Sequence, residues 1–159
     1  MLFSDYDTRL AAYAVIIDEV KRLLVTWWNG AGHGIPGWTL PGGGVEYDES
    51  LVEAVQREVF EETGYVVEVG APVVAHSFTE AGGGRDGRPF KAVRMLYSAI
   101  IVGGQLGTTE IGGSTDLAAW VPLAEIPGLE SRSTILDVAY ATIQQQGWCA
   151  FPASAQPDR

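Results

Sequence analysis

The sequence predicts a mixed α+β fold within a single domain, residues 1–159, and three observations support this prediction. Short apolar segments rich in β-branched residues are separated by glycine-rich turns over most of the chain. Two segments, 50–63 and 131–146, instead carry apolar residues at helical spacing. Strands and helices do not alternate strictly, so a mixed-sheet sandwich is favoured over a doubly wound parallel sheet.

The first predicted strands lie at Ala11–Asp18 and Arg22–Trp28. Both segments are apolar, and the polar turn between them is typical of a β-hairpin. A glycine-rich loop, 29–37, precedes a short extended segment at Trp38–Leu40. The remaining non-helical segments are a strand within 65–79, a loop at 80–88, a strand at 91–102, a turn at 103–114 and a short strand at 119–121.

The first helix is marked at both ends. Ser50 and Glu53 have the spacing of a capping box, in which each side chain bonds the other residue's backbone N–H. Gly64 stands where helices commonly end in the left-handed conformation. The apolar residues at helical spacing, which predict the buried face, are Val52, Val55 and Val59.

The second helix is predicted to begin at Ser131 or Ser133 and to be followed by a flexible tail, 151–159. The apolar residues expected on its buried face are Leu136, Ala139, Tyr140 and Ile143.

Charge limits the classes of partner. The chain has 20 acidic and 10 basic residues, a net charge of −10. This disfavours binding to a long nucleic acid, which depends on neutralising many phosphates with Lys and Arg. A small phosphorylated substrate stays compatible, because bound divalent cations can reverse the local sign of an acidic site.

Nothing in the sequence predicts membrane insertion or secretion. No apolar run reaches the ~18 residues of a membrane span, and the N-terminus lacks the basic start of a secretory signal. The single cysteine, Cys149, cannot form a disulfide within the chain. A cytoplasmic location is the expectation.

The acidic residues are clustered on the first helix. Glu58, Glu61 and Glu62 are spaced i, i+3 and i+4, so they share one face. Clustered carboxylate oxygens suit hard cations such as Mg²⁺ or Mn²⁺, although Glu is also common on solvated helix faces. Seven of the 20 acidic residues fall within 46–62, namely Glu46, Asp48, Glu49, Glu53, Glu58, Glu61 and Glu62.

The wider pattern of residues 43–65 resembles the Nudix box, the signature of the Nudix hydrolases. Tyr65 departs from the aliphatic residue that the family usually has. The segments Trp38–Glu46 and Ala118–Ile126 are also similar to the family, but Leu117 stands where an acid is frequent, with Asp116 beside it. The matching box positions are Gly43, Glu49, Arg57, Glu58, Glu61, Glu62 and Gly64.

The resemblance implies an α/β/α sandwich around a mixed sheet, with the box forming a loop–helix–loop. It also implies a hydrolase that uses Mg²⁺ or Mn²⁺ to cleave a diphosphate bond in a nucleoside diphosphate linked to another moiety. A nucleoside triphosphate or modified nucleotide is the default substrate, and a homodimer is left open. The alternatives are a metal-dependent isomerase and an inactive or weakly active nucleotide- or metabolite-binding module.

Transferred by position, the resemblance also implies roles for individual residues. Glu58 and Glu62 are the strongest metal ligands, followed by Glu61. Arg57 would orient Glu58, Glu49 would support Arg57 or the metal shell, and the glycines at 42–44 would let a ligand approach the backbone closely.

Outside the box, candidates are weaker. The general base comes either from the box or from a later carboxylate, with Glu110 first and Asp116 second. The alternative for Glu110 is an ordinary exposed loop acid. Trp28 could stack on a base or pack in the core, and Arg88 could belong to a cationic lid over the phosphates or be a solvated loop charge. The other lid candidates are Arg85, Lys91 and Arg94.

Overall fold

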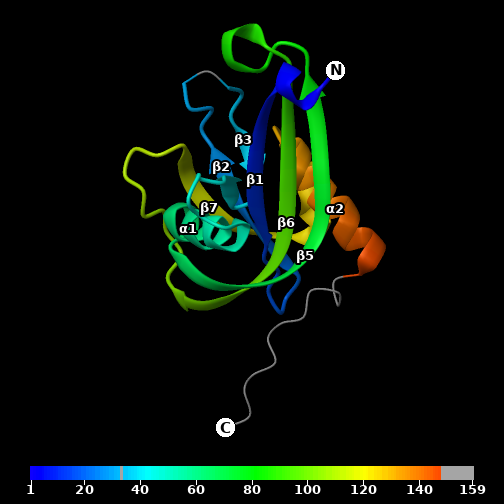
Figure 1. Cartoon of the computed structure of the whole chain (residues 1–159). Helices are drawn as coiled ribbons and strands as arrows, with labels where there is room; N and C mark the ends of the chain where they lie inside the picture. Colours follow the sequence, from blue (N-terminus) through cyan, green and yellow to red (C-terminus); the bar gives the residue numbers. More distant parts are fainter. Residues whose placement is uncertain (33, 148–159) are drawn as a thin grey trace.

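The computed structural model describes residues 1–32 and 34–147 and contains seven strands and two α-helices (Figure 1). Cys149, His33 and the tail 151–159 lie outside the described residues. The elements are β1 (Asp7–Val15), β2 (Arg22–Trp28), β3 (Gly37–Thr39), β4 (Gly42–Gly44), α1 (Leu51–Thr63), β5 (Tyr65–Glu80), β6 (Phe90–Gly104), β7 (Thr115–Pro122) and α2 (Thr134–Gln146). Short 3₁₀ turns lie at Phe3–Asp5, Arg85–Gly87 and Leu123–Gly128.

The strands form two sheets. The larger has the order β4-β1-β6-β5 and the smaller the order β3-β2-β7. Strands β1 and β6 are parallel over nine residue pairs, whereas the other neighbours are antiparallel. The predicted mixed sheet is therefore confirmed.

The predicted hairpin of the first two strands is wrong beyond its turn. Near the turn, Asp18 N–H donates to the Arg22 carbonyl at 3.0 Å, and Ile17 forms an isolated bridge with Leu23. Past these residues, β1 and β2 separate into different sheets. Residues 11–16 and 23–26 are buried throughout. Both strands therefore pack on both faces, as layers of a sandwich and not as a free hairpin.

The two helices cover opposite sides of the strands, as in an α/β/α sandwich (Figure 1). Alternate residues of β1 point to the two sides. On one side they pack with β2 and α2, where Ile135, Leu136, Ala139 and Ile143 are buried. On the other they pack with α1 through Ala54, Val55 and Val59.

Several strands are longer than predicted. Strand β1 begins at Asp7, four residues before the predicted start, because its polar first half pairs with β6 from Asp7↔Phe90 onward. Strand β7 begins at Thr115 because it pairs with β2. Backbone pairing with a distant strand extends both beyond their apolar segments. Within the described residues, no helix is long and apolar enough to span a membrane.

Candidate active site

Helix α1 has the predicted ends. Glu53 N–H donates to Ser50 Oγ at 3.2 Å, and Ser50 N–H donates to the Glu53 carboxylate at 2.7 Å. Gly64 adopts a left-handed φ of 74° and donates its N–H to the Phe60 carbonyl. The predicted buried face needs one correction, since Val52 is 39% exposed whereas Ala54 is buried. The helix is rotated so that Glu62 also faces inward, 7% exposed.

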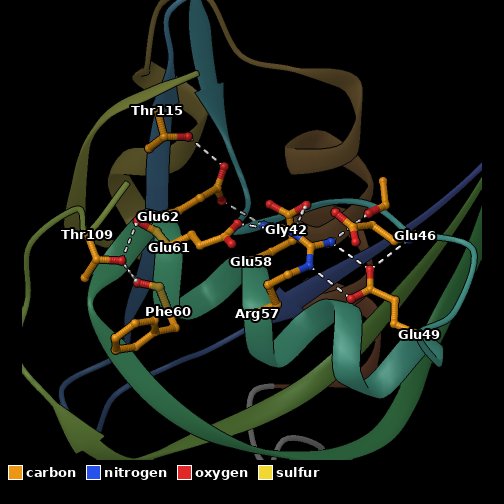
Figure 2. Close-up of polar contacts among 11 residues, drawn as sticks. Gly42, Glu46, Glu49, Arg57, Glu58, Phe60, Glu61, Glu62, Thr109 and Thr115 are labelled. Carbon is orange, nitrogen blue, oxygen red and sulfur yellow. Dashed lines mark hydrogen bonds and ion pairs between the residues drawn. The ribbon is translucent and has the colours of Figure 1, made fainter. Parts of the chain in front are cut away.

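Arg57 lies at the centre of a group of carboxylates (Figure 2). Its guanidinium contacts Glu49 at 2.7 Å and both Glu58 and Glu61 at 3.1 Å, and it also donates to the Gly44 carbonyl at 3.1 Å. The hydrogen bonds from Arg57 hold the pKa of Glu49 below its usual value. Arg57 thus joins the helix start, the helix middle and β4 in one rigid unit.

Glu58 lies against the glycine strand β4. A Cβ atom on Gly43 would be only 2.5 Å from Glu58 Oε1, so glycine is needed here for the carboxylate to take this position. The Glu58 side chain is 16% exposed. Burial raises its pKa above the usual value, although Arg57 opposes the shift.

Glu62 is the most deeply buried carboxylate of the motif. It accepts hydrogen bonds from Thr115 Oγ1 at 2.6 Å and from Gly42 N–H at 2.9 Å (Figure 2). Burial raises its pKa to about 8, despite these two hydrogen bonds and with the charges of Glu58 and Glu110 adding to the shift. In the absence of a cation, burial therefore favours the protonated, uncharged form of the Glu62 carboxyl over the charged form.

This burial predicts a pH-dependent stability of the metal-free protein. Because the folded pKa is raised from 4.5 to about 8, the proton on Glu62 stabilises the fold fully below pH 4.5 and this contribution is lost as pH rises through 8. The melting temperature in EDTA should fall by roughly 10 °C between pH 5 and 8. Glu62→Gln should remove most of that fall, because the amide keeps hydrogen-bonding groups but cannot ionise.

The matched control is Glu68→Gln, which changes an exposed carboxyl on β5. It should keep the pH dependence of the parent protein. If the Glu62→Gln protein melts with the same pH dependence as the parent, Glu62 does not carry the shift.

Glu58 and Glu62 line a cavity of about 640 Å³, within the size range of small-ligand sites. Its walls come from α1, β1, β4, β6, the loop after β2 and the start of α2. Three other residues predicted as substrate contacts line the same cavity, namely Trp28, Gly42 and Gly43.

Other predicted residues lie elsewhere. Arg88 is not in the cavity wall: it pairs with Asp7 at 3.4 Å and donates to the Ser4 carbonyl, at the start of β1. Its role in covering the substrate stays a prediction, to which this placement adds no support. Glu61 is directed to Arg57, with its side chain 36% exposed.

Of the later carboxylates, Glu110 lies on the loop before β7 and Asp116 lies within the start of β7. Glu110 is exposed, and its backbone N–H donates to the Glu61 carbonyl at 3.3 Å, so the loop is fastened to the end of α1. Asp116 accepts a hydrogen bond from the Asn29 side chain at 2.8 Å. Neither lines the cavity.

Sequence reasoning missed Arg9 and Tyr13, which line the cavity from β1. Arg94 of β6, considered only as part of a lid, lies in the cavity wall as well. Arg9, Ala11 and Tyr13 have the two-residue period of one strand face. Tyr13 already lay within the predicted strand, and the same period would have added Arg9 if the strand had been predicted to start at Asp7.

The donor set fits a hard divalent cation. Glu58 and Glu62 supply only oxygen atoms, and burial leaves their negative charge poorly compensated. In the described residues no three Asp, Glu, His or Cys side chains converge as ligands. A cation there would complete its shell with water or with oxygen atoms of a bound ligand, as Mg²⁺ commonly does.

Comparison with known proteins gives consistent matches. A family model described as NUDIX domain matches residues 7–139. A Bacillus subtilis (strain 168) protein, provisionally named 8-oxo-dGTP diphosphatase, is 30% identical over 73% of this chain and 68% of its own length. An 8-oxo-dGDP phosphatase of Mus musculus is 37% identical over 57% of this chain, which spans about a quarter (25%) of the mouse protein.

Solved structures share the fold. The crystal structure of a MutT protein from Methanosarcina mazei Go1 superimposes with a TM-score of 0.72 at 24% identity, covering 89% of this chain and 96% of that chain.

Proposed function

The chain belongs to the NUDIX family and is a MutT-like Nudix hydrolase, and from this premise we propose that it cleaves a diphosphate bond in a modified nucleoside di- or triphosphate with Mg²⁺ or Mn²⁺. The observation that carries the proposal is the convergence of Glu58 and Glu62 on the cavity that Trp28 also lines. The relatives named for 8-oxo-dGTP and 8-oxo-dGDP support the modified nucleotide as the substrate class.

Glu58 and Glu62 are the proposed metal-holding residues, with Glu61 beside them. A divalent cation bound there would neutralise the diphosphate oxygens and lower the pKa of the attacking water. Thr115 and Gly42 fix the orientation of the Glu62 carboxylate. Arg57 fixes Glu58, and Glu49 in turn fixes Arg57, so the carboxylates are positioned before substrate binds.

Glu110 is the proposed general base. Its loop is fastened to α1 by hydrogen bonds from the Thr109 and Glu110 N–H groups to the Glu61 carbonyl, at 2.8 and 3.3 Å. The charge of Glu110 also raises the pKa of Glu62, which places the two carboxylates within electrostatic reach. The carboxylate now lies against Gly113, so it must turn toward the cavity to take a proton from water.

Trp28 is the proposed contact for the nucleobase. It is half-buried in the cavity wall, whereas its neighbour Trp27 packs edge-on against Trp38 at 5.2 Å. The strand register shifts at a β-bulge between Trp27 and Trp28, so the two side chains can have different surroundings and different roles. Gly34 of the following loop packs directly on the Trp28 indole, since a Cβ there would lie 2.0 Å from the ring.

The test is a substrate panel with purified protein and Mg²⁺ or Mn²⁺. The panel should contain unmodified and 8-oxo nucleoside di- and triphosphates, ADP-ribose and a dinucleoside polyphosphate, with phosphate and diphosphate release measured separately. The proposal expects the highest kcat/KM on a modified di- or triphosphate. If panel compounds bind but none of them is hydrolysed, the result would instead favour the binding-only alternative.

Trp28→Ala is expected to raise KM about tenfold and to change kcat less than about threefold. The indole contacts the base in the ground state and in the transition state alike, so its loss weakens the binding of both states equally and raises KM without lowering kcat. Base–aromatic stacking contributes roughly 1–3 kcal/mol. Steady-state kinetics on the best panel substrate measures both constants. Arg88→Ala is the control, because Arg88 lies outside the cavity wall, and it should keep the parent KM. Equal effects of the two variants would contradict the proposed base contact.

A further inference from the structure

Two arginines in the cavity wall have no carboxylate partner in the part of the chain that the structure describes. Within the described residues, Arg22, Arg57, Arg88 and Arg132 each pair with an acid. Arg9 and Arg94 do not, although both line the cavity that contains Glu58 and Glu62.

The sheet places these two cations on one face. In the parallel register Ala11 of β1 lies opposite Arg94 of β6, and Arg9 precedes Ala11 by two residues. Alternation therefore directs both guanidinium groups to the side covered by α2. They are close enough to interact, because the pKa of Arg94, lowered mainly by burial, is lowered further by the charge of Arg9.

Arg94 is held in place before any ligand arrives. Its guanidinium stacks on Phe78 at 4.4 Å from the ring centroid and donates to Thr134 Oγ1 at 2.9 Å. Neither partner neutralises its charge. Arg94 is thus a fixed cation beside the exposed cation Arg9, and two guanidinium groups on one strand face favour an anion between them.

Tyr13 marks where this cationic end meets the acidic end. Burial raises the pKa of Tyr13, the charges of Arg94 and Arg9 lower it, and those of Glu62 and Glu58 raise it. Adjacent glycines of β4 border the two ends of this one cavity: Glu58 lies against Gly43, and the Arg9 guanidinium lies against Gly44, 3.5 Å from where a Cβ of residue 44 would be. A phosphate chain held at the carboxylates could thus extend to the arginines.

We propose that Arg9 and Arg94 bind the terminal phosphate of the substrate and so select nucleotides that end in a free phosphate over nucleoside diphosphates whose outer phosphate is esterified. This inference rests on the proposed nucleotide hydrolysis. A terminal phosphate has a charge near −2 and three free oxygens. Two guanidinium forks can satisfy these oxygens, whereas an esterified phosphate offers fewer oxygens and less charge.

The test compares KM for a nucleoside triphosphate and for ADP-ribose in Arg9→Gln and Arg94→Gln proteins. Each variant should raise KM for the triphosphate by roughly ten- to a hundredfold, the effect of losing a hydrogen bond to a charged group. kcat for the triphosphate and KM for ADP-ribose should change less than about threefold. Arg85→Gln is the matched control, since Arg85 is exposed, has no carboxylate partner among the described residues and lies outside the cavity wall.

A binding measurement separates this inference from the proposed catalysis. Calorimetric titration of inorganic tripolyphosphate into the protein in EDTA needs neither metal nor turnover. Tripolyphosphate binding should persist in Glu58→Gln and weaken at least about tenfold in Arg9→Gln. Because Arg9 is exposed, this substitution should leave the fold intact. Unchanged tripolyphosphate affinity, or equal KM increases for both substrates, would overturn the inference. A parent protein that hydrolyses no nucleotide would refute the proposed function instead.

Discussion

Glu58→Gln is expected to lower kcat by about 10²- to 10⁴-fold, the range associated with losing a positioned catalytic group. The amide is close in shape to the carboxylate, so it fits against Gly43 and can still accept from Arg57. It has no negative charge, and so it cannot neutralise a cation or take up a proton. The measurement is steady-state kcat on the best panel substrate, with the melting temperature recorded for the same preparation.

Two further variants make this result specific. Glu68→Gln removes an exposed acid of β5 and should keep the parent kcat. Glu110→Gln distinguishes the source of the general base: a loss of about a hundredfold or more would place it on the loop before β7, and a parent-like kcat would place it in the box. A folded Glu58→Gln protein with kcat within threefold of the parent would contradict the assigned role of Glu58.

Chelation with EDTA is expected to abolish turnover, and added Mg²⁺ or Mn²⁺ to restore it. The cause is the pair of carboxylates, half-buried Glu58 and buried Glu62, whose charge the described protein groups compensate only in part. Ca²⁺ should bind with poor turnover, because its longer and looser coordination misplaces the phosphate oxygens. Diphosphate release measured before and after metal addition tests the prediction.

Metal binding should also be visible without substrate. A cation that binds only the folded state raises the melting temperature, and here it would also relieve the repulsion between buried carboxylates. Glu58→Gln combined with Glu62→Gln should lose this increase. Full turnover in EDTA, or the same metal-induced increase in the double variant, would contradict the assignment of these residues to the metal.

The limits of α1 could be predicted because they depend on neighbours in sequence. Ser50 and Glu53 cap the helix across three residues, and Gly64 ends it through a bond to Phe60. The same holds for the i, i+4 contact between Arg57 and Glu61. Spacing also placed the acids on one helix face, and the box pattern identified the family.

Strand partners could not be predicted in the same way. The polar turn after β1 is present, but β1 continues beside β6 and β4, and β2 beside β7 and β3. Apolar composition shows that a strand is buried without showing which strand covers it. For the same reason the cationic pair of Arg9 and Arg94 was visible only after β1 and β6 had been placed in register.

Taken alone, the sequence determined the candidate residues: a capped helix with Glu58, Glu61 and Glu62 on one face, preceded by the glycines that form β4. Tertiary structure decided which of them face the cavity, burying Glu62 against Thr115, 53 residues away, while Glu61 turns to Arg57. It also placed Arg88 beside Ser4, 84 residues away and outside the cavity. Local hydrogen bonds follow from covalent spacing, whereas contacts across such separations form only when two sheets and two helices close around a common core.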